Sequence, residues 1–119
     1  MPFTSRLKPL PSSPNCVSSL ADPNDRVHWI APLQVSGDGA IAAVQAVLAG
    51  MPRVSIETVE PDYLHAVARS RIFRFPDDLE FQLDPDDGLV HVRSAARLGY
   101  GDFGVNRKRV EAIRRALAG

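Results

Sequence analysis

Between residues 53 and 95 the chain alternates apolar and polar side chains with a period of two, and this pattern constrains its fold more than any other feature. Four stretches carry the pattern: "RVSIETVE", "YLHAVARSRIF", "LEFQLD" and "LVHVRSA". They are separated by segments containing "PD", "PDD" and "PDDG", which are typical of turns because proline fixes φ and aspartate bonds nearby backbone groups. Short turns join antiparallel strands, whereas parallel strands need a long crossover. The sequence therefore predicts a four-stranded antiparallel meander.

The same alternation sorts the side chains between the two faces of the predicted sheet. One face is apolar and is expected to pack on the core: Val54, Ile56, Leu64, Ala66, Ala68, Ile72, Leu79, Phe81, Leu83, Val90 and Val92. The opposite face is polar and holds Ser55, Glu57, His65, Arg69, Glu80, Gln82, His91 and Arg93. An antiparallel sheet of this kind needs a second layer over its apolar face.

A helix in the segment "SGDGAIAAVQAVLAGMP", residues 36–52, can supply part of that layer. Its apolar residues recur at helical spacing. Ser36 or Asp38 can cap the start, and Gly50 followed by Pro52 marks the end. We therefore expect this helix to precede the four strands.

A second helix is predicted from about Val105 to Leu117, where apolar residues fall near one face and arginines occupy the last turns. Residues 1–26 are rich in proline and serine and show no periodicity, which indicates an extended N-terminal arm. Residues 27–119 are predicted to form one α+β domain of order α-β-β-β-β-α, with both helices on one face of the sheet.

The turn lengths also predict which polar side chains face each other across strands. Three pairs follow from this register: Glu80 with Arg93, Gln82 with His91, and Glu57 with His65. A carboxylate beside an imidazole or a guanidinium suits acid–base or anion-binding chemistry. Opposite charges across strands are also ordinary on a solvated sheet face, where each pair contributes roughly 0.2–1 kcal/mol. The pattern thus supplies only weak catalytic candidates, namely His65, His91 and Glu80.

The segment "RSAARLGYGDFGVNRKRV", residues 93–110, has two physical interpretations. In the structural one, its glycines provide backbone freedom, Asp102 caps the last helix, Arg97 pairs with an acid, and Asn106 and Arg107 bond loop carbonyls. In the functional one, Arg93, Arg97 and Arg107 converge on a carboxylate or phosphate near the helix N-terminus. For the arginines the sequence leaves both open.

Composition excludes several classes of function. A single cysteine, Cys16, rules out an intramolecular disulfide and a multi-cysteine zinc site, and a buried role is expected for it over a reactive one. No P-loop motif or nucleophile elbow is present, and we expect no metal and no cofactor. The formal net charge is zero and the pI about 6.8, which argues against nucleic-acid binding. No membrane span is expected, and the chain as written is expected to be cytoplasmic unless a leader or anchor has been lost.

Several motifs in order resemble a bacterial and plastid family catalogued as domain of unknown function 1499. They are "SSPNCVSS" at 12–19, "YLHAVARS" at 63–70, "RFPDDLEF" at 74–81, the segment at 93–110, and the final helix. The resemblance implies a shared fold and no assigned activity. It also implies recurring roles for Asn15, Cys16, His65, Arg69, Ser70, Glu80, Arg93, Ser94, Arg97, Asp102, Asn106 and Arg107.

The sequence favours a non-enzymatic binding or accessory module that recognises a small anionic ligand or a protein partner. Its predicted surface combines the arginine-rich segment with the polar sheet face, and the ligand-binding candidates are Arg69, Glu80, Arg93, Arg97, Asn106 and Arg107. The alternative is an enzyme that uses a histidine and a glutamate on the sheet face as an acid–base pair.

Overall fold

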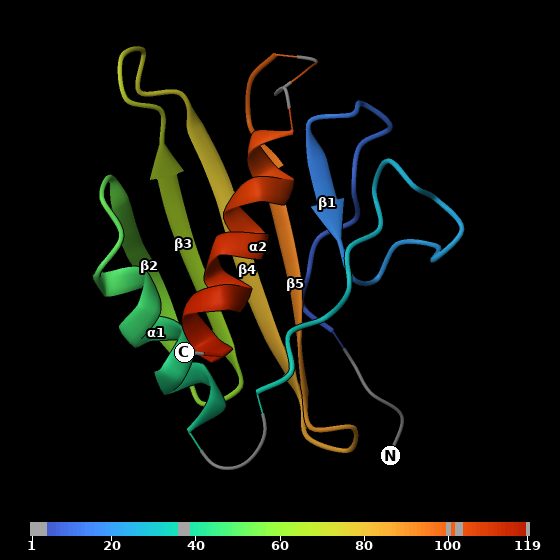
Figure 1. Ribbon diagram of the computed structural model, residues 1–119, viewed down its shortest axis with the longest axis vertical. Helices are drawn as coiled ribbons and strands as arrows, with labels where there is room; N and C mark the ends of the chain where they lie inside the picture. Colours follow the sequence, from blue (N-terminus) through green and yellow to red (C-terminus); the bar gives the residue numbers. More distant parts are fainter. Residues whose placement is uncertain (1–4, 36–38, 100, 102–103, 119) are drawn as a thin grey trace.

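The computed structural model describes residues 5–35, 39–99, 101 and 104–118, and within them two helices cover one face of a five-stranded antiparallel sheet (Figure 1). The strands lie in the order β1-β5-β4-β3-β2. Their bounds are β1 Cys16–Ser18, β2 Val54–Glu60, β3 Tyr63–Arg69, β4 Pro76–Asp84 and β5 Leu89–Ala96, and the helices are α1 Ala40–Ala49 and α2 Val105–Ala118. The predicted α+β class and the meander from β2 to β5 are confirmed.

The fifth strand corrects the prediction of four. β1 lies within the segment predicted to be an extended arm, and it pairs Cys16, Val17 and Ser18 with Ala95, Ser94 and Arg93 at the edge of β5. All three β1 residues are buried, so they show no alternation between a wet and a dry face. A three-residue strand buried on both faces carries no periodic signal, which is why the sequence pattern did not reveal it.

The turn between β3 and β4 is longer than the sequence predicts. β3 ends at Arg69 instead of continuing to Phe73, and Ile72, predicted to face the core, is 80% exposed. Ser70 closes this turn twice: its N–H donates to the Phe75 carbonyl at 3.1 Å, and its hydroxyl accepts the Phe75 N–H at 2.9 Å. These bonds use the backbone groups that a continued strand would need.

The core lies between the sheet and the two helices, where alternation predicted it. Leu64 and Leu79 from the sheet are fully buried against Val44 of α1 and Ile113 of α2. The predicted helical faces are therefore confirmed for both helices. The expected caps at positions 36 and 38 lie outside the described residues, and α1 begins after Gly39, whose φ of 86° suits glycine.

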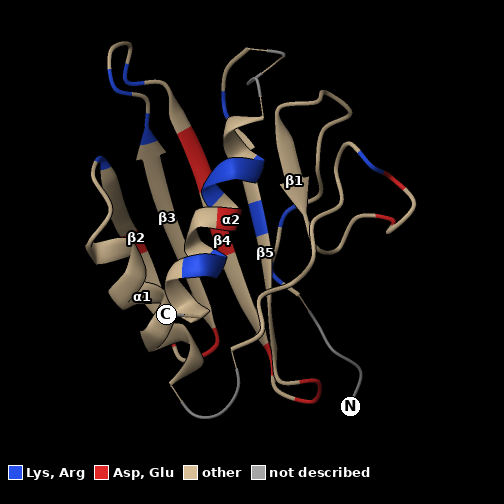
Figure 2. Cartoon of the chain, viewed as in Figure 1, with Lys and Arg blue, Asp and Glu red and all other residues tan. Residues whose placement is uncertain are grey.

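The meander separates charge between the two ends of the sheet (Figure 2). The β2–β3 and β4–β5 turns share one end and carry Glu60, Asp62, Asp84, Asp86 and Asp87. The β3–β4 turn lies at the other end and carries arginines. Along the sequence these residues are mixed, because successive turns of an antiparallel meander alternate between ends.

Candidate functional site

The polar sheet face lies opposite the helices and is built mainly by β4 and β5. Two of the predicted cross-strand pairs are confirmed there, Glu80 with Arg93 and Gln82 with His91. The third is wrong: a register shift between Ile56 and Thr58 places Thr58 opposite His65, in place of Glu57. One extra residue in a bulge moves every later side chain of the strand by one position relative to its partner.

Glu80 is the centre of a buried polar cluster on this face. It is 2% exposed, and one carboxylate oxygen accepts a hydrogen bond of 2.5 Å from the Tyr63 hydroxyl. The other oxygen lies 3.5 Å from Arg93 Nη1, while the Nε of the same guanidinium is buried without a hydrogen-bond partner among the described residues. Burial, followed by the hydrogen bond and charge of Glu80, raises the pKa of Tyr63. The tyrosine therefore acts as a donor to a carboxylate that also faces a cation.

Residues 5–12, the part of the predicted N-terminal segment that we call the arm, cover this cluster and contact it through backbone atoms. The Arg6 N–H donates to Gln82 Oε1 at 3.2 Å, and the Lys8 N–H donates to Glu80 Oε1 at 3.4 Å. Arg93 Nη2 donates to the Pro9 carbonyl at 3.3 Å. Side chains of the sheet face thus form hydrogen bonds with the main chain of an extended segment.

The side chain of Arg6 adds ionic contacts between the arm and the sheet margin. Its guanidinium lies over the Tyr63 ring, 4.7 Å from the centroid, and pairs with Glu60 at 2.8 Å and with Asp62. These groups are about half exposed, so each ion pair contributes little to stability on its own.

A second polar cluster lies at the start of β4, where Asp78 contacts Arg97 and His65. Arg97 donates to its carboxylate from Nε at 2.7 Å and Nη2 at 2.8 Å, and His65 Nε2 lies 2.8 Å from Oδ1. The Arg97 hydrogen bonds, with a smaller contribution from His65, lower the pKa of Asp78 to about 2. The His65 side chain is therefore bonded to Asp78, which lies two residues before Glu80 on β4.

His91 belongs to a Ser–His–Asp arrangement that the sequence did not indicate. Its Nδ1 lies 2.9 Å from Ser19 Oγ, and its Nε2 lies 3.9 Å from Asp84 Oδ2. Burial lowers the pKa of His91. The Ser19 hydroxyl also accepts the Val92 N–H at 2.9 Å and is nearly buried, so this group joins the residue that follows β1 to β5.

The remaining predicted ligand-binding residues lie outside the cluster around Glu80. Arg107 on α2 donates to the carbonyls of residues 26, 27 and 29, the last at 2.8 Å. Arg69 approaches Ser55 Oγ at 3.5 Å. Of the two interpretations left open for the arginines, the functional one would bring three of them together on an anion. In the structure they contact three different groups: Arg93 contacts Glu80, Arg97 contacts Asp78, and Arg107 contacts loop carbonyls.

Asn106 is fully buried on the helix side of the sheet and joins three parts of the chain. Its side-chain oxygen accepts hydrogen bonds from the hydroxyl of Ser94 on β5 and from Arg109 Nη1, the latter at 3.0 Å. Its amide donates to the Asn15 carbonyl at 3.0 Å, and the Asn15 side chain in turn donates to the Gly99 carbonyl at 2.8 Å. This network holds β1, β5 and α2 together.

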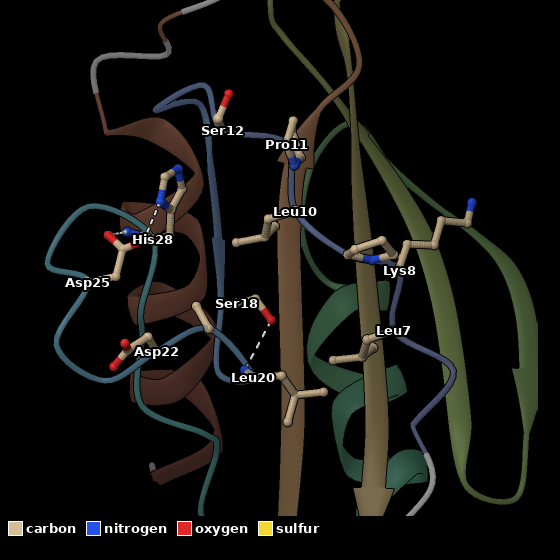
Figure 3. A pocket seen from close by; sticks show the side chains of 12 residues that line it. Leu7, Lys8, Leu10, Pro11, Ser12, Ser18, Leu20, Asp22, Asp25 and His28 are labelled. Atoms are coloured by element: carbon tan, nitrogen blue, oxygen red, sulfur yellow. Dashed lines mark hydrogen bonds and ion pairs between the residues drawn. The ribbon is translucent and has the colours of Figure 1, made fainter.

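A pocket of about 620 Å³ opens beside the arm, between residues 7–12 and the segment 18–28 (Figure 3). Leu7, Leu10 and Leu20 provide apolar surface in it. His28 at its margin bonds the Ser13 carbonyl at 2.9 Å and Asp25 at 2.7 Å, and both contacts raise its pKa. Sequence reasoning missed this pocket, because it depends on where the arm lies.

Neither a metal centre nor a membrane-spanning helix is seen in the described ranges. Among those residues no group of three or more His, Cys, Asp or Glu side chains is arranged to hold a metal ion. Each described helix is too short or too polar to cross a bilayer.

A family model described as a protein of unknown function, DUF1499, matches residues 6–117 of this chain. The chain belongs to the DUF1499 family. The matched range includes the arm, the whole sheet and nearly all of α2, which confirms the resemblance seen in the motifs. No curated protein matches the chain.

Several residues that the DUF1499 resemblance singles out have internal contacts in this structure. Asn15, Ser94 and Asn106 belong to the buried network, and Cys16 is fully buried in β1. Ser70 closes the β3–β4 turn. Asp102 lies outside the described residues. These contacts stabilise the domain whatever it binds.

The depressed pKa of Asp78 makes a pH-dependent prediction for this DUF1499 domain. Because the folded-state value of about 2 lies below the ordinary 3.8, the ionised carboxylate stabilises the fold above about pH 4, and this stabilisation disappears as the pH falls toward 2. We expect Asp78→Asn to lower the unfolding free energy by about 1–2 kcal/mol at neutral pH, a value reduced for partial solvent screening, and to lose this difference near pH 2.

Urea denaturation across this pH range measures the effect. The matched control is Asp86→Asn, which changes an exposed carboxylate in the β4–β5 turn. A difference between wild type and Asp78→Asn that stays constant with pH would contradict the assignment.

Proposed function

We propose that this domain is a non-enzymatic binding module whose polar sheet face receives an extended, proline-containing segment of a protein partner. One observation carries the proposal: Gln82, Glu80 and Arg93 contact the backbone of residues 6, 8 and 9 as they would contact a bound peptide. Recognition of extended proline-containing segments uses the same chemistry, with aromatic and polar side chains beneath a preformed backbone. In this proposal the arm, a segment of the same chain, occupies the place where the partner segment would bind.

The properties of the covered face support exchange of that occupant. The arm's main-chain contacts are 3.2–3.4 Å long, at the weak end of hydrogen-bond geometry. The side chains beneath it are a carboxylate, a carboxamide and a guanidinium, which water can solvate when the arm leaves. Uncovering such a face costs less than uncovering an apolar face of equal area.

A protein partner is favoured over a small anionic ligand because the arginines have internal partners. Arg97 and Arg93 face carboxylates, and Arg107 is engaged by three backbone carbonyls. An anion at any of these positions must compete with a contact already made. An extended segment leaves the carboxylate and carbonyl partners of these three arginines within the sheet and α2 in place, and it replaces the contacts of the arm, including the Arg6 ion pairs with Glu60 and Asp62.

The test uses a fluorescently labelled peptide with the sequence of residues 5–12, SRLKPLPS, added to the full chain. The arm competes at the high effective concentration of a tethered segment, so wild type is expected to bind the peptide weakly. Arg6→Ala in the protein removes the arm's ionic contacts, and we expect it to bind the peptide at least about tenfold more tightly, as measured by fluorescence anisotropy.

Two controls decide the interpretation of this experiment. A peptide with alanine in place of its arginine is expected to lose the gain, because it cannot replace the Tyr63, Glu60 and Asp62 contacts. Arg115→Gln, an exposed arginine on α2, should bind like wild type. Equal binding to wild type and Arg6→Ala, or no binding to either, would overturn the proposal.

A further inference from the structure

The turn between β3 and β4 lies at one end of the sheet (Figure 1), and it exposes a group of large apolar side chains. We call residues 70–76 the hairpin tip. Within it Ile72 is 80% exposed, Phe73 73% and Phe75 52%. The two phenylalanine rings stack with their centroids 5.5 Å apart. Exposed side chains of this size, gathered in one turn, mark an interaction surface more often than isolated exposed residues do.

The hairpin tip is held in this conformation by its own hydrogen bonds. Ser70 closes the turn onto Phe75 through both its N–H and its hydroxyl. The segment after β5 passes alongside, where the Arg97 N–H donates to the Pro76 carbonyl at 3.1 Å, and the adjacent Leu98 is 58% exposed. The turn therefore presents its apolar side chains to solvent in the folded state, and a fourth exposed apolar residue, Leu98, lies in the adjacent segment after β5.

Arginines surround these apolar side chains. Arg71 and Arg74 alternate with them in the tip, and both are exposed with no ion pair among the described residues. Arg53 and Arg69 lie at the same end, joined by a backbone hydrogen bond of 3.0 Å. The acids that follow the tip, residues 77 and 78, are already bonded to Arg109 and to Arg97 with His65.

The opposite end of the sheet is acidic, as Figure 2 shows. Its two turns carry Glu60, Asp62, Asp84, Asp86 and Asp87. A molecule with this charge separation turns its basic end toward a negatively charged surface and keeps its acidic end away from it. The charge distribution and the apolar side chains thus favour the same orientation.

We propose that the hairpin tip docks this domain on an anionic lipid bilayer. In this arrangement Ile72, Phe73 and Phe75 insert at the level of the lipid headgroups, and Arg71 and Arg74 contact lipid phosphates. Aromatic and aliphatic side chains flanked by arginine are suited to that depth, where the bilayer passes from polar to apolar. The anionic surface attracts each nearby arginine electrostatically.

The shape of the tip favours a bilayer over a second protein. A stable protein interface buries at least about 1,000 Å² over matched surfaces. The hairpin tip is a single turn with three exposed apolar side chains, Ile72, Phe73 and Phe75, and Leu98 lies beside it. Shallow insertion into a deformable lipid surface needs no matching partner shape.

Vesicle flotation of the full chain tests this proposal. We expect binding to vesicles of equimolar phosphatidylserine and phosphatidylcholine, at least about tenfold stronger than to phosphatidylcholine alone and weakened by salt. Ile72→Ser combined with Phe73→Ser should reduce binding to the anionic vesicles by about tenfold or more. Arg71→Gln combined with Arg74→Gln should remove most of the preference for anionic lipid.

Matched controls change residues of the same type elsewhere. Leu20→Ser replaces a leucine that is 45% exposed beside the arm, and Arg115→Gln replaces an exposed arginine of α2. Both should bind vesicles like wild type. The variants alter exposed side chains, and thermal unfolding verifies that each is folded.

Two results would overturn the proposal. One is no vesicle binding by wild type at low salt. The other is equal binding by wild type and by both hairpin-tip variants. If the serine variant instead abolishes self-association of a chain that does not bind vesicles, the tip contacts a second copy and the bilayer assignment is wrong.

Discussion

Glu80→Ala is expected to lower the unfolding free energy by about 3–5 kcal/mol, because it leaves the buried Arg93 guanidinium without its counter-charge. The same change removes the acceptor of the Tyr63 hydroxyl and of the Lys8 N–H. Urea denaturation at neutral pH measures the loss. The expected loss is a large share of the roughly 5–15 kcal/mol of unfolding free energy of a domain of this size.

Two further substitutions separate charge from shape at this position. Glu80→Gln keeps an oxygen for Tyr63 and Lys8 but carries no charge, so we expect a smaller loss of about 1–3 kcal/mol. Glu57→Ala changes an exposed glutamate of β2 and should stay within about 0.5 kcal/mol of wild type. A loss below about 1 kcal/mol for Glu80→Ala would show that the Arg93 charge is solvated in the folded protein.

The second large effect is expected for Asn106→Ala, with a loss of about 2–4 kcal/mol. Asn106 bonds Ser94 and the Asn15 carbonyl in a fully buried setting, and its removal deprives both of a hydrogen bond that water cannot easily replace. The higher helix propensity of alanine offsets about 0.5 kcal/mol of this loss. Thermal unfolding should show the midpoint lowered by about 10 °C.

A double-mutant cycle with Ser94→Ala tests whether the effect arises from the network. In that background Asn106→Ala should cost about 1 kcal/mol less, since the serine hydroxyl no longer needs a partner. Lys108→Ala, at an exposed position two residues further along α2, controls for helix propensity and should change stability little. Additive losses in the cycle would show that Ser94 and Asn106 act independently.

The two proposals concern different parts of the molecule and fail independently. The peptide-binding face depends on Glu80, Gln82 and Arg93 beneath the arm. The hairpin tip lies between the end of β3 and the start of β4 and includes none of these residues. A domain that docks on a bilayer through one end can still present its sheet face to a partner.

Much of the candidate site was predictable because it depends on local pattern. A period of two and the length of the "PDDG" turn place Glu80 opposite Arg93, and the structure confirms this pair. The prediction that Glu57 pairs with His65 was wrong because a bulge in β2 shifts the register. No residue type in the sequence indicates that bulge. His65 meets Asp78 instead, a residue the sequence assigned to a turn.

The sequence by itself determined the class, the meander, both helices and the polar character of the sheet face opposite the helices. These features follow from side-chain periodicity and turn chemistry within a few neighbouring residues. Only the tertiary structure decided that residues 5–12 cover that face, that β1 completes the sheet, and that Asn106 reaches Asn15. Such contacts join segments up to 91 positions apart, and they form because buried polar groups need partners wherever packing places them.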